Sequence, residues 1–383
     1  MADTGDNPPR KTGSIEIQEY VAAIAGTDEL PKDDIRPVLL GLFGEVGEMM
    51  ATVKKVHRER EAYVGHARAA TEELGDTLWY FATLCGRLGI SLDELFLAAA
   101  EAGKGGMAIA AHDTNRSPIS RVPLIAAIGT MEDELIHLGE DTAALLSVRA
   151  DGRRERELMS LFANSYLRVV HASGLSFAGV ARNNIEKTVG RFCEPDPAKL
   201  PDFDCLFKEE EQLPREFRIE IVQRESGKTN MRWNGVFIGD PLTDNIRDPD
   251  DYRFHDVFHF AYASILHWSP VVRALLKQKR KSDAKSDEEQ DGGRAIVVEE
   301  GLTAWIFSCA KQVDFFANRR KLPFDLLKTV GEFIAGYEVE QCPLKLWERA
   351  ILDGYEVFRQ IRDAKRGIIV GNRSERTISF EPL

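Results

Sequence analysis

The chain has 383 residues, of which 43% are hydrophobic and 29% charged, as is typical of a folded globular protein of two or three domains. The formal net charge of −12 argues against broad binding to nucleic acid or to an anionic membrane surface. No run approaches the roughly 18 apolar residues of a membrane span, and the polar start of the chain lacks a signal-peptide pattern. Five scattered cysteines without CxxC spacing favour reduced thiols, so we expect a cytoplasmic protein. From the charge and the lack of a long apolar run, we expect it to bind neither membranes nor nucleic acid.

Two acidic pairs dominate the first part of the chain. Residues 1–13 are polar and predict a disordered tail, and the first helix is expected to begin near Ser14. Pro31 separates this helix from the stretch 41–80, where hydrophobic residues surround both acidic pairs. Each pair has i, i+3 spacing, so on a helix its two carboxylates project from the same face. The pairs are Glu45 with Glu48 and Glu73 with Asp76.

Four carboxylates that converge between two helices repel one another, which raises their pKa values or requires a bound cation. A hard divalent ion meets this requirement, because Mg²⁺ prefers oxygen ligands and usually shares its coordination sphere with substrate phosphates. Helical bundles build metal sites in this way, from carboxylates on facing helices. The alternative is that both pairs are solvated helix faces, and residue chemistry alone leaves the two interpretations open.

The segments GEVGE (44–48) and EELGDTLWY (72–80) together resemble the signature of the MazG-like nucleoside triphosphate pyrophosphohydrolases. That all-helical family uses an ExxE…ExxD set of carboxylates. Its first motif usually begins with two glutamates, and Gly44 occupies the place of the first one. The resemblance implies a helical bundle that binds Mg²⁺, or alternatively Mn²⁺, and a nucleoside triphosphate substrate. The implied catalytic and metal-binding residues are Glu45, Glu48, Glu73 and Asp76.

Three further side chains near these motifs are candidates for substrate contact. Lys54 lies nine residues past Glu45 and is within reach of a phosphate bound at the metal. A solvated basic helix face explains Lys54 equally well. Trp79 and Tyr80 are candidates for stacking on the base, and a place in the core is the alternative for Trp79.

The next part of the chain resembles a degenerate copy of the first. A Gly-rich connector at 103–118 separates the two. Residues 84–96 and 169–181 align at a constant offset of 85, which pairs Gly-Ile-Ser with Gly-Leu-Ser. In this register, apolar residues replace two of the expected metal ligands. They are Leu158 in place of Glu73 and Leu161 in place of Asp76.

We therefore expect an internal pseudo-duplication within a domain at 14–195, with an active half at 14–103 and a degenerate half at 119–195. The second half ends in NNIEKTVGRF (183–192), which resembles the NxxKxxxR helix that closes the family's fold. The resemblance implies that three residues on one face of this helix contact the substrate. The alternative is a helix C-terminus stabilised by cations. The three residues are Asn184, Lys187 and Arg191.

A Pro-rich, acidic segment at 196–214 predicts a linker to a C-terminal domain at 215–383. FRIEIVQR (217–224) and MRWNGVFIG (231–239) alternate like strands and predict a β-hairpin. Helical patterns predominate beyond the hairpin, and a further strand is predicted near the end of the chain. The expected fold is mainly α, with an all-α helical bundle followed by a mostly helical domain that contains a β-hairpin.

Histidine and carboxylate side chains gather in two helical segments of the C-terminal domain, at 252–268 and 295–307. Such groups on facing helices can bind a metal or perform acid–base catalysis. The alternative is a core histidine that is hydrogen-bonded to a glutamate, since the motif lacks the glutamate of HExxH. These candidates for a second site are His255, Asp256, His259, Glu299 and Glu300.

Three segments, FHDVFHFAYA, HWSPVVRALLKQKRKS and VEEGLTAWIF, resemble the C-terminal domain of some MazG-like proteins over about 215–340. This second resemblance implies no defined chemistry. Our first hypothesis is Mg²⁺-dependent hydrolysis of a nucleoside triphosphate to the monophosphate and pyrophosphate, by a homodimer. The alternative is a nucleotide-sensing regulatory protein with little turnover, in which the C-terminal domain is the effector. A separate activity of the C-terminal cluster is a third hypothesis.

Overall fold

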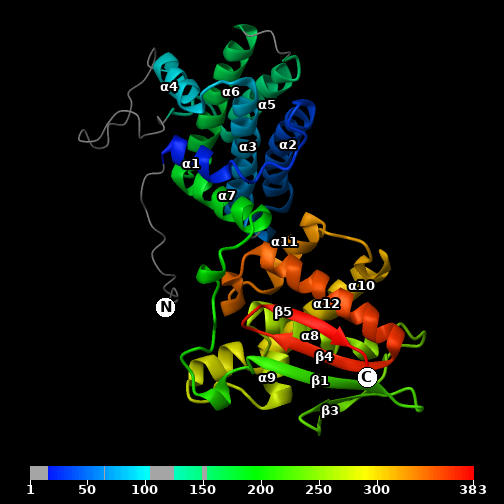
Figure 1. Ribbon diagram of the computed structural model, residues 1–383. Helices are drawn as coiled ribbons and strands as arrows, with labels where there is room; N and C mark the ends of the chain where they lie inside the picture. Colours follow the sequence, from blue (N-terminus) through cyan, green and yellow to red (C-terminus); the bar gives the residue numbers. More distant parts are fainter. Residues whose placement is uncertain (1–15, 64, 104–124, 149–152) are drawn as a thin grey trace. The chain divides into compact units, whose positions relative to one another are not determined.

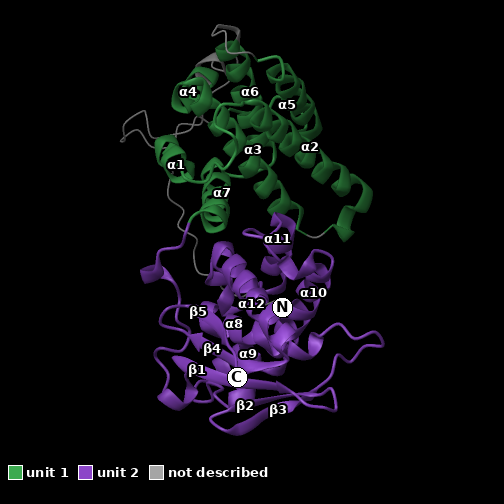
Figure 2. Cartoon of the chain, turned by 45° about the vertical axis from the view of Figure 1, so that its right-hand side comes forward, with its two compact units in different colours: residues 1–193 green, residues 194–383 purple. Residues whose placement is uncertain are grey.

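The computed structural model describes residues 16–63, 65–103, 125–148 and 153–383 (Figure 1). The chain divides into two compact units, residues 1–193 and 194–383, which we call the N-terminal and C-terminal units (Figure 2). Each unit has its own hydrophobic core. The tail expected at 1–13 and most of the connector expected at 103–118 lie outside the described residues.

The described part of the N-terminal unit is built of helices, as the sequence predicts. They are α1 (Ile17–Ile24), α2 (Arg36–Glu59), α3 (His66–Leu88), α4 (Leu92–Gly103), α5 (Met131–Leu145), α6 (Arg153–Ala172) and α7 (Phe177–Phe192). Helices α2 and α3 pack along each other, and α5 and α6 form a second packed pair that also contacts α2. Helix α4 packs on α6, and α7 packs on α3, so α3 lies between α2 and α7.

Apolar residues at helical spacing explain the pairing of α2 with α3. The residues that α2 buries include Val38, Leu42, Val46 and Met49. Pro37 occupies the first turn of α2, where the missing N–H costs no helical hydrogen bond. Helix α3 ends at Leu88 because Gly89 adopts a φ of 65°, in the left-handed region that favours glycine.

The α3–α4 and α6–α7 turns have the same construction. Gly89 and Gly174 both have positive φ, at 65° and 70°. Two residues later, the hydroxyls of Ser91 and Ser176 accept hydrogen bonds from the backbone N–H groups three positions on, at 3.3 Å and 3.0 Å. The alignment at an offset of 85 residues therefore coincides with two helix–turn–helix connections of the same geometry.

The C-terminal unit combines helices with a five-stranded antiparallel sheet of order β3-β2-β1-β4-β5. The strands are β1 (Glu216–Gln223), β2 (Thr229–Trp233), β3 (Val236–Leu242), β4 (Arg366–Asn372) and β5 (Thr377–Glu381). The α-helices are α8 (Asp256–Ala261), α9 (Pro270–Leu276), α10 (Gly293–Lys311), α11 (Phe324–Phe333) and α12 (Leu344–Ala364). Helices α8 and α12 pack on each other and against β4 and β5.

This sheet is larger than the predicted hairpin. The segment 231–239 is not one strand, because Asn234 and Gly235 both have positive φ, at 51° and 79°. Positive φ at two consecutive residues defines a two-residue type I′ turn, for which Asn-Gly is the strongest sequence signal. The final segment also contributes two strands instead of one, and β4 pairs with β1, far away in the sequence.

The segment 196–214, expected to be a linker, belongs to the C-terminal unit. Its Asp204 is buried and accepts hydrogen bonds from the Leu213 backbone N–H at 2.8 Å, from Arg273 at 2.6 Å and from Arg373 at 2.8 Å. Buried charges of this kind require partners. The two arginine contacts connect the segment to the rest of the unit.

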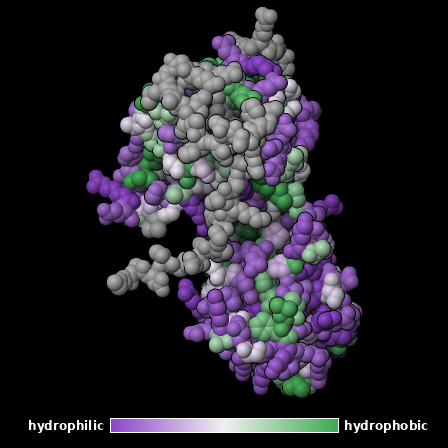
Figure 3. Space-filling model, turned by 90° about the vertical axis from the view of Figure 1, so that its left-hand side faces the viewer, coloured by the Kyte–Doolittle hydropathy of each residue, from purple (hydrophilic) through white to green (hydrophobic). Residues whose placement is uncertain are grey.

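The face of the C-terminal unit in Figure 3 is mostly hydrophilic, with scattered hydrophobic side chains. Among the described residues, no helix combines the length and the apolar character that a membrane span requires.

Candidate functional site

Carboxylates from α2 and α3 converge in the N-terminal unit. One oxygen each from Glu45, Glu73 and Asp76 lies within 4.8 Å of the other two, so the three side chains can hold a metal ion. All three are half-buried. Glu48, one turn after Glu45 on α2, is exposed and lies outside this group, which we call the carboxylate cluster.

A glycine brings α2 close to α3 beside the carboxylate cluster. A Cβ atom at Gly41 would lie 2.1 Å from the ring of Tyr80, so only glycine allows the ring to pack there. Burial raises the pKa of Tyr80, and the negative charges of Glu45 and Asp76 raise it further. The Tyr80 hydroxyl therefore stays protonated beside the cluster.

A second glycine brings α7 close to α3. A Cβ atom at Gly75 would lie 2.9 Å from the Cβ of Asn184. The Asn184 side-chain Nδ2 donates a hydrogen bond to Oδ1 of Asp76 at 3.0 Å. The hydroxyl of Tyr20 on α1 donates to the Asn184 Oδ1 at 2.8 Å, which fixes the orientation of the amide.

Lys187 on α7 places a positive charge beside the carboxylate cluster. Its Nζ lies 2.5 Å from Asp76 and 2.8 Å from Glu72. Burial by itself lowers the pKa of Lys187, but Asp76 and Glu72 raise it above the usual value. Lys187 therefore remains an ammonium and offsets part of the negative charge.

The carboxylate cluster is strained electrostatically without a cation. Burial raises the pKa of Glu45 to about 8, and Asp76 and Glu73 add to the shift. Near neutral pH, Glu45 thus keeps a proton that an exposed glutamate would lose. A divalent cation between the three carboxylates would offset this shift, since it supplies the compensating charge in place of the proton.

The other substrate-binding candidates do not belong to the carboxylate cluster itself. Lys54 is exposed on α2. Trp79 is buried and donates a hydrogen bond from Nε1 to the Thr27 hydroxyl at 2.7 Å, which is the core position weighed as its alternative. Arg191 is buried, with its guanidinium 5.4 Å from the ring centre of Phe192. Sequence reasoning missed Tyr20 and Glu72. Glu72 adjoins the second motif, whereas nothing in the local pattern marks Tyr20.

A second group of metal-binding side chains lies in the C-terminal unit. One ligand atom each from His255, Asp256 and His259 lies within 4.8 Å of the other two. His259 is fully buried, and its Nδ1 lies 2.8 Å from Glu299 Oε1. Burial by itself lowers the pKa of His259, but Glu299 and Glu300 raise it to about 10. Glu299 and Glu300 lie on α10. Together with the three residues His255, Asp256 and His259, they form what we call the histidine cluster.

Comparison with known proteins finds a similarity in this second unit. Residues 198–383 match the family model of the MazG C-terminal domain. The resemblance seen in the sequence over about 215–340 is thereby confirmed and extended, while the N-terminal unit lies outside the match. No curated protein matches the chain, and no solved structure does.

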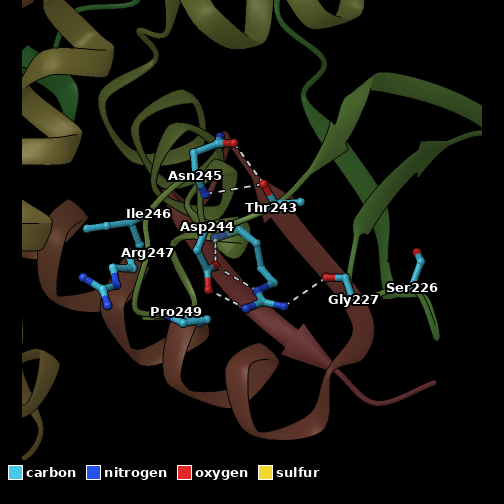
Figure 4. Close-up of a pocket in the computed structure, with 9 residues that line it drawn as sticks. Ser226, Gly227, Thr243, Asp244, Asn245, Ile246, Arg247 and Pro249 are labelled. Atoms are coloured by element: carbon cyan, nitrogen blue, oxygen red, sulfur yellow. Dashed lines mark hydrogen bonds and ion pairs between the residues drawn. The ribbon is translucent and has the colours of Figure 1, made fainter.

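The C-terminal unit also has an open pocket of about 430 Å³ (Figure 4). Its lining comes from the β1–β2 turn and the loop after β3. The guanidinium of Arg253 pairs with Asp244 and donates to the Gly227 carbonyl at 2.9 Å, so these two charged groups satisfy each other, and Arg247 also lines the pocket. None of its lining residues belongs to the carboxylate cluster or to the histidine cluster.

Proposed function

We propose that the N-terminal unit is a Mg²⁺-dependent nucleoside triphosphate pyrophosphohydrolase, which forms the monophosphate and pyrophosphate. The observation that supports this proposal is the approach of Glu45, Glu73 and Asp76 to within 4.8 Å between packed helices. Three oxygen ligands with open positions are typical of Mg²⁺ sites that share the ion with phosphates, and Mn²⁺ accepts similar ligands. The motif resemblance and the matched MazG C-terminal domain agree with this assignment.

The residues of the site suit this reaction. Mg²⁺ polarises phosphoryl oxygens and lowers the pKa of bound water. Attack of water on the α-phosphorus breaks its bond to the pyrophosphate oxygen, and a carboxylate of the cluster accepts the proton of the water. Asn184 positions Asp76 through its hydrogen bond. Lys187 lies at the edge of the cluster, where its charge is placed to stabilise the phosphates. We keep Glu48 as a fourth carboxylate, one turn from Glu45, with Lys54 and Arg191 as outer phosphate contacts.

The test uses the purified full-length chain with Mg²⁺ and a panel of nucleoside and deoxynucleoside triphosphates, with release of pyrophosphate and monophosphate measured. We expect turnover of at least one substrate and a loss of at least about 100-fold in Glu73→Gln, which removes a ligand charge. Glu157→Gln is the matched control, because Glu157 is an exposed carboxylate of α6.

Two results would contradict the proposal. Pyrophosphate release that is equal in the wild type and in Glu73→Gln would place the activity elsewhere. Tight nucleotide binding without release from any substrate would favour the nucleotide sensor instead.

A further inference from the structure

We propose that the C-terminal unit holds one divalent transition-metal ion, such as Zn²⁺, bound by His255, His259 and Glu300. His255 immediately precedes α8, His259 lies within α8, and Glu300 lies on α10, which packs against α8. This site is separate from the carboxylate cluster and is not needed for the proposed hydrolase activity.

The Glu300 carboxylate lies close to both imidazoles. Oε2 of Glu300 lies 3.6 Å from Nε2 of His255 and 3.4 Å from Nε2 of His259. In a tetrahedral zinc site, ligands about 2.0–2.1 Å from the ion lie about 3.3–3.4 Å from one another. Both separations from Glu300 are close to this value, so its carboxylate can share one ion with either imidazole.

The outer nitrogens of both imidazoles already have the partners that a metal site requires. Nδ1 of His255 lies 2.9 Å from the Tyr252 carbonyl oxygen, so it donates a hydrogen bond. Nδ1 of His259 lies 2.8 Å from Oε1 of Glu299. Metal-bound histidines almost always donate their second N–H in this way, which directs the lone pair of the other nitrogen toward the ion.

Glu299 is a rigid outer partner and not a fourth ligand. Its Oε1 also accepts a hydrogen bond from the Ser269 hydroxyl at 2.6 Å, and its Oε2 accepts one from the Val271 backbone N–H at 2.8 Å. Glu299 contacts Nδ1 of His259, whereas the proposed ion would bind Nε2 on the other side of the ring, so Glu299 is an outer partner. The side chain is fully buried, so these bonds hold the His259 ring in place.

The observation that most favours a bound ion is the environment of Nε2 of His259. The side chain is 0% exposed, and among the described residues this nitrogen makes no hydrogen bond of good geometry, its charged neighbour being Glu300 Oε2 at 3.4 Å. Buried polar atoms without a partner are rare and costly. A metal ion bound by Glu300 and His259 would satisfy this nitrogen.

Asp256 offers a further ligand, and the partial exposure of Glu300 gives access to the site. An oxygen of Asp256 lies within 4.8 Å of a nitrogen of both histidines, so it can become a fourth ligand. Glu300 is 40% exposed and His255 is 12% exposed, which gives an ion access from solvent. Two imidazoles with one or two carboxylates favour Zn²⁺, Fe²⁺ or Ni²⁺ over Mg²⁺.

The test titrates Zn²⁺ into the full-length chain after removal of metals, in competition with a chromophoric chelator. All proteins carry Glu73→Gln, so that Zn²⁺ binding to the carboxylate cluster is weakened. We expect one tight site per chain in this parent, weakened at least 10- to 100-fold by His255→Gln and by Glu300→Gln. Both replaced side chains reach the surface, so we expect the variants to fold. Glu332→Gln, at an exposed carboxylate of α11, is the control that keeps the site.

Zinc X-ray absorption of the loaded parent provides a second measurement that does not depend on any variant. Two imidazole ligands in the first coordination shell would support the site. No stoichiometric Zn²⁺, a first shell without imidazole, or unchanged affinity in both folded variants would overturn it. In that case His259 is an imidazolium held between two glutamates, a structural ion pair of the core.

Discussion

Asn184 on α7 donates a hydrogen bond to Asp76 on α3 at 3.0 Å, although 108 residues separate them in the sequence. The amide cannot turn over, because the Tyr20 hydroxyl donates to its oxygen. Asp76 thus meets a fixed N–H donor on Oδ1 and the Lys187 ammonium on Oδ2. A carboxylate held at both oxygens keeps its position before any cation binds, which is the preorganisation that a metal site needs.

We expect Asn184→Ala to lower pyrophosphate release about 10- to 100-fold, because Asp76 loses its fixed donor. The free energy of unfolding should fall by about 1–3 kcal/mol, since the buried Tyr20 hydroxyl loses its acceptor. Initial rates and urea denaturation measure the two effects. The neighbouring variant Asn183→Ala is the control, with an expected change within about 0.5 kcal/mol. Equal activity in the two variants would show that the amide does not position Asp76.

The stability of the metal-free protein should depend on Glu45 and on pH. The Glu45 pKa is about 8 in the folded chain, above the roughly 4.3 of an exposed glutamate. Between these values the folded state binds the extra proton, so the contribution of Glu45 to stability falls as pH rises from about 4 to 8. Glu45→Gln keeps a neutral side chain at every pH.

Urea denaturation of the wild type and Glu45→Gln in a chelator tests this dependence. The free energy of unfolding of the variant should rise relative to that of the wild type as pH rises. At pH 9 it should be higher by roughly 1–3 kcal/mol, a value reduced for the partial exposure of Glu45. Mg²⁺ should stabilise the wild type more than the variant. A difference between the two proteins that stays constant from pH 5 to 9 would contradict the shifted pKa.

Glu73 and Glu48 should contribute unequally to activity. Glu73 belongs to the carboxylate cluster, whereas Glu48 is exposed one turn from Glu45. We therefore expect the loss of pyrophosphate release in Glu48→Gln to be at least about 10-fold smaller than in Glu73→Gln. Measurements across a range of Mg²⁺ concentrations separate weakened metal binding from a slower reaction. Equal losses would mean that Glu48 turns into the cluster once the ion is bound.

Gly75 should tolerate no larger residue. In Gly75→Ala the new methyl would meet the Asn184 Cβ at 2.9 Å, so α7 must shift away from α3. We expect a loss of about 1–3 kcal/mol in unfolding free energy, together with reduced activity. Gly47→Ala on α2 is the control, because nothing lies within 4 Å of its added methyl. That exposed change should stabilise the helix by up to about 1 kcal/mol. Thermal unfolding of the pair gives the comparison.

The helical parts of the fold could be predicted because their signals are local. Apolar spacing and the two acidic pairs locate α2 and α3, and glycine followed by serine marks two of the turns. The Asn-Gly turn between β2 and β3 is also visible in the sequence, but the alternation of its flanking residues predicts a single strand in its place. The pairing of β1 with β4 carried no local signal, since it joins segments far apart in the chain.

The residues of the candidate site also fall into those that the sequence predicts and those that depend on tertiary packing. Spacing and motif pointed to Glu45, Glu73 and Asp76, which the folded chain gathers. The same spacing also included Glu48, because i, i+3 residues share a helix face without sharing a depth of burial. The contacts that α1 and α7 make with the cluster depend on tertiary packing, so the role of Tyr20 was beyond sequence reasoning.

The groups that hold Asp76 come from α7, the last helix of the N-terminal unit. A ribosome making this protein therefore releases every acidic residue of the cluster well before it releases Asn184 and Lys187. A gene fragment that stops ahead of α7 would still encode both acidic motifs, yet its product would lack the partners that fix them. Genome surveys that count such motifs alone would score these fragments as intact enzymes.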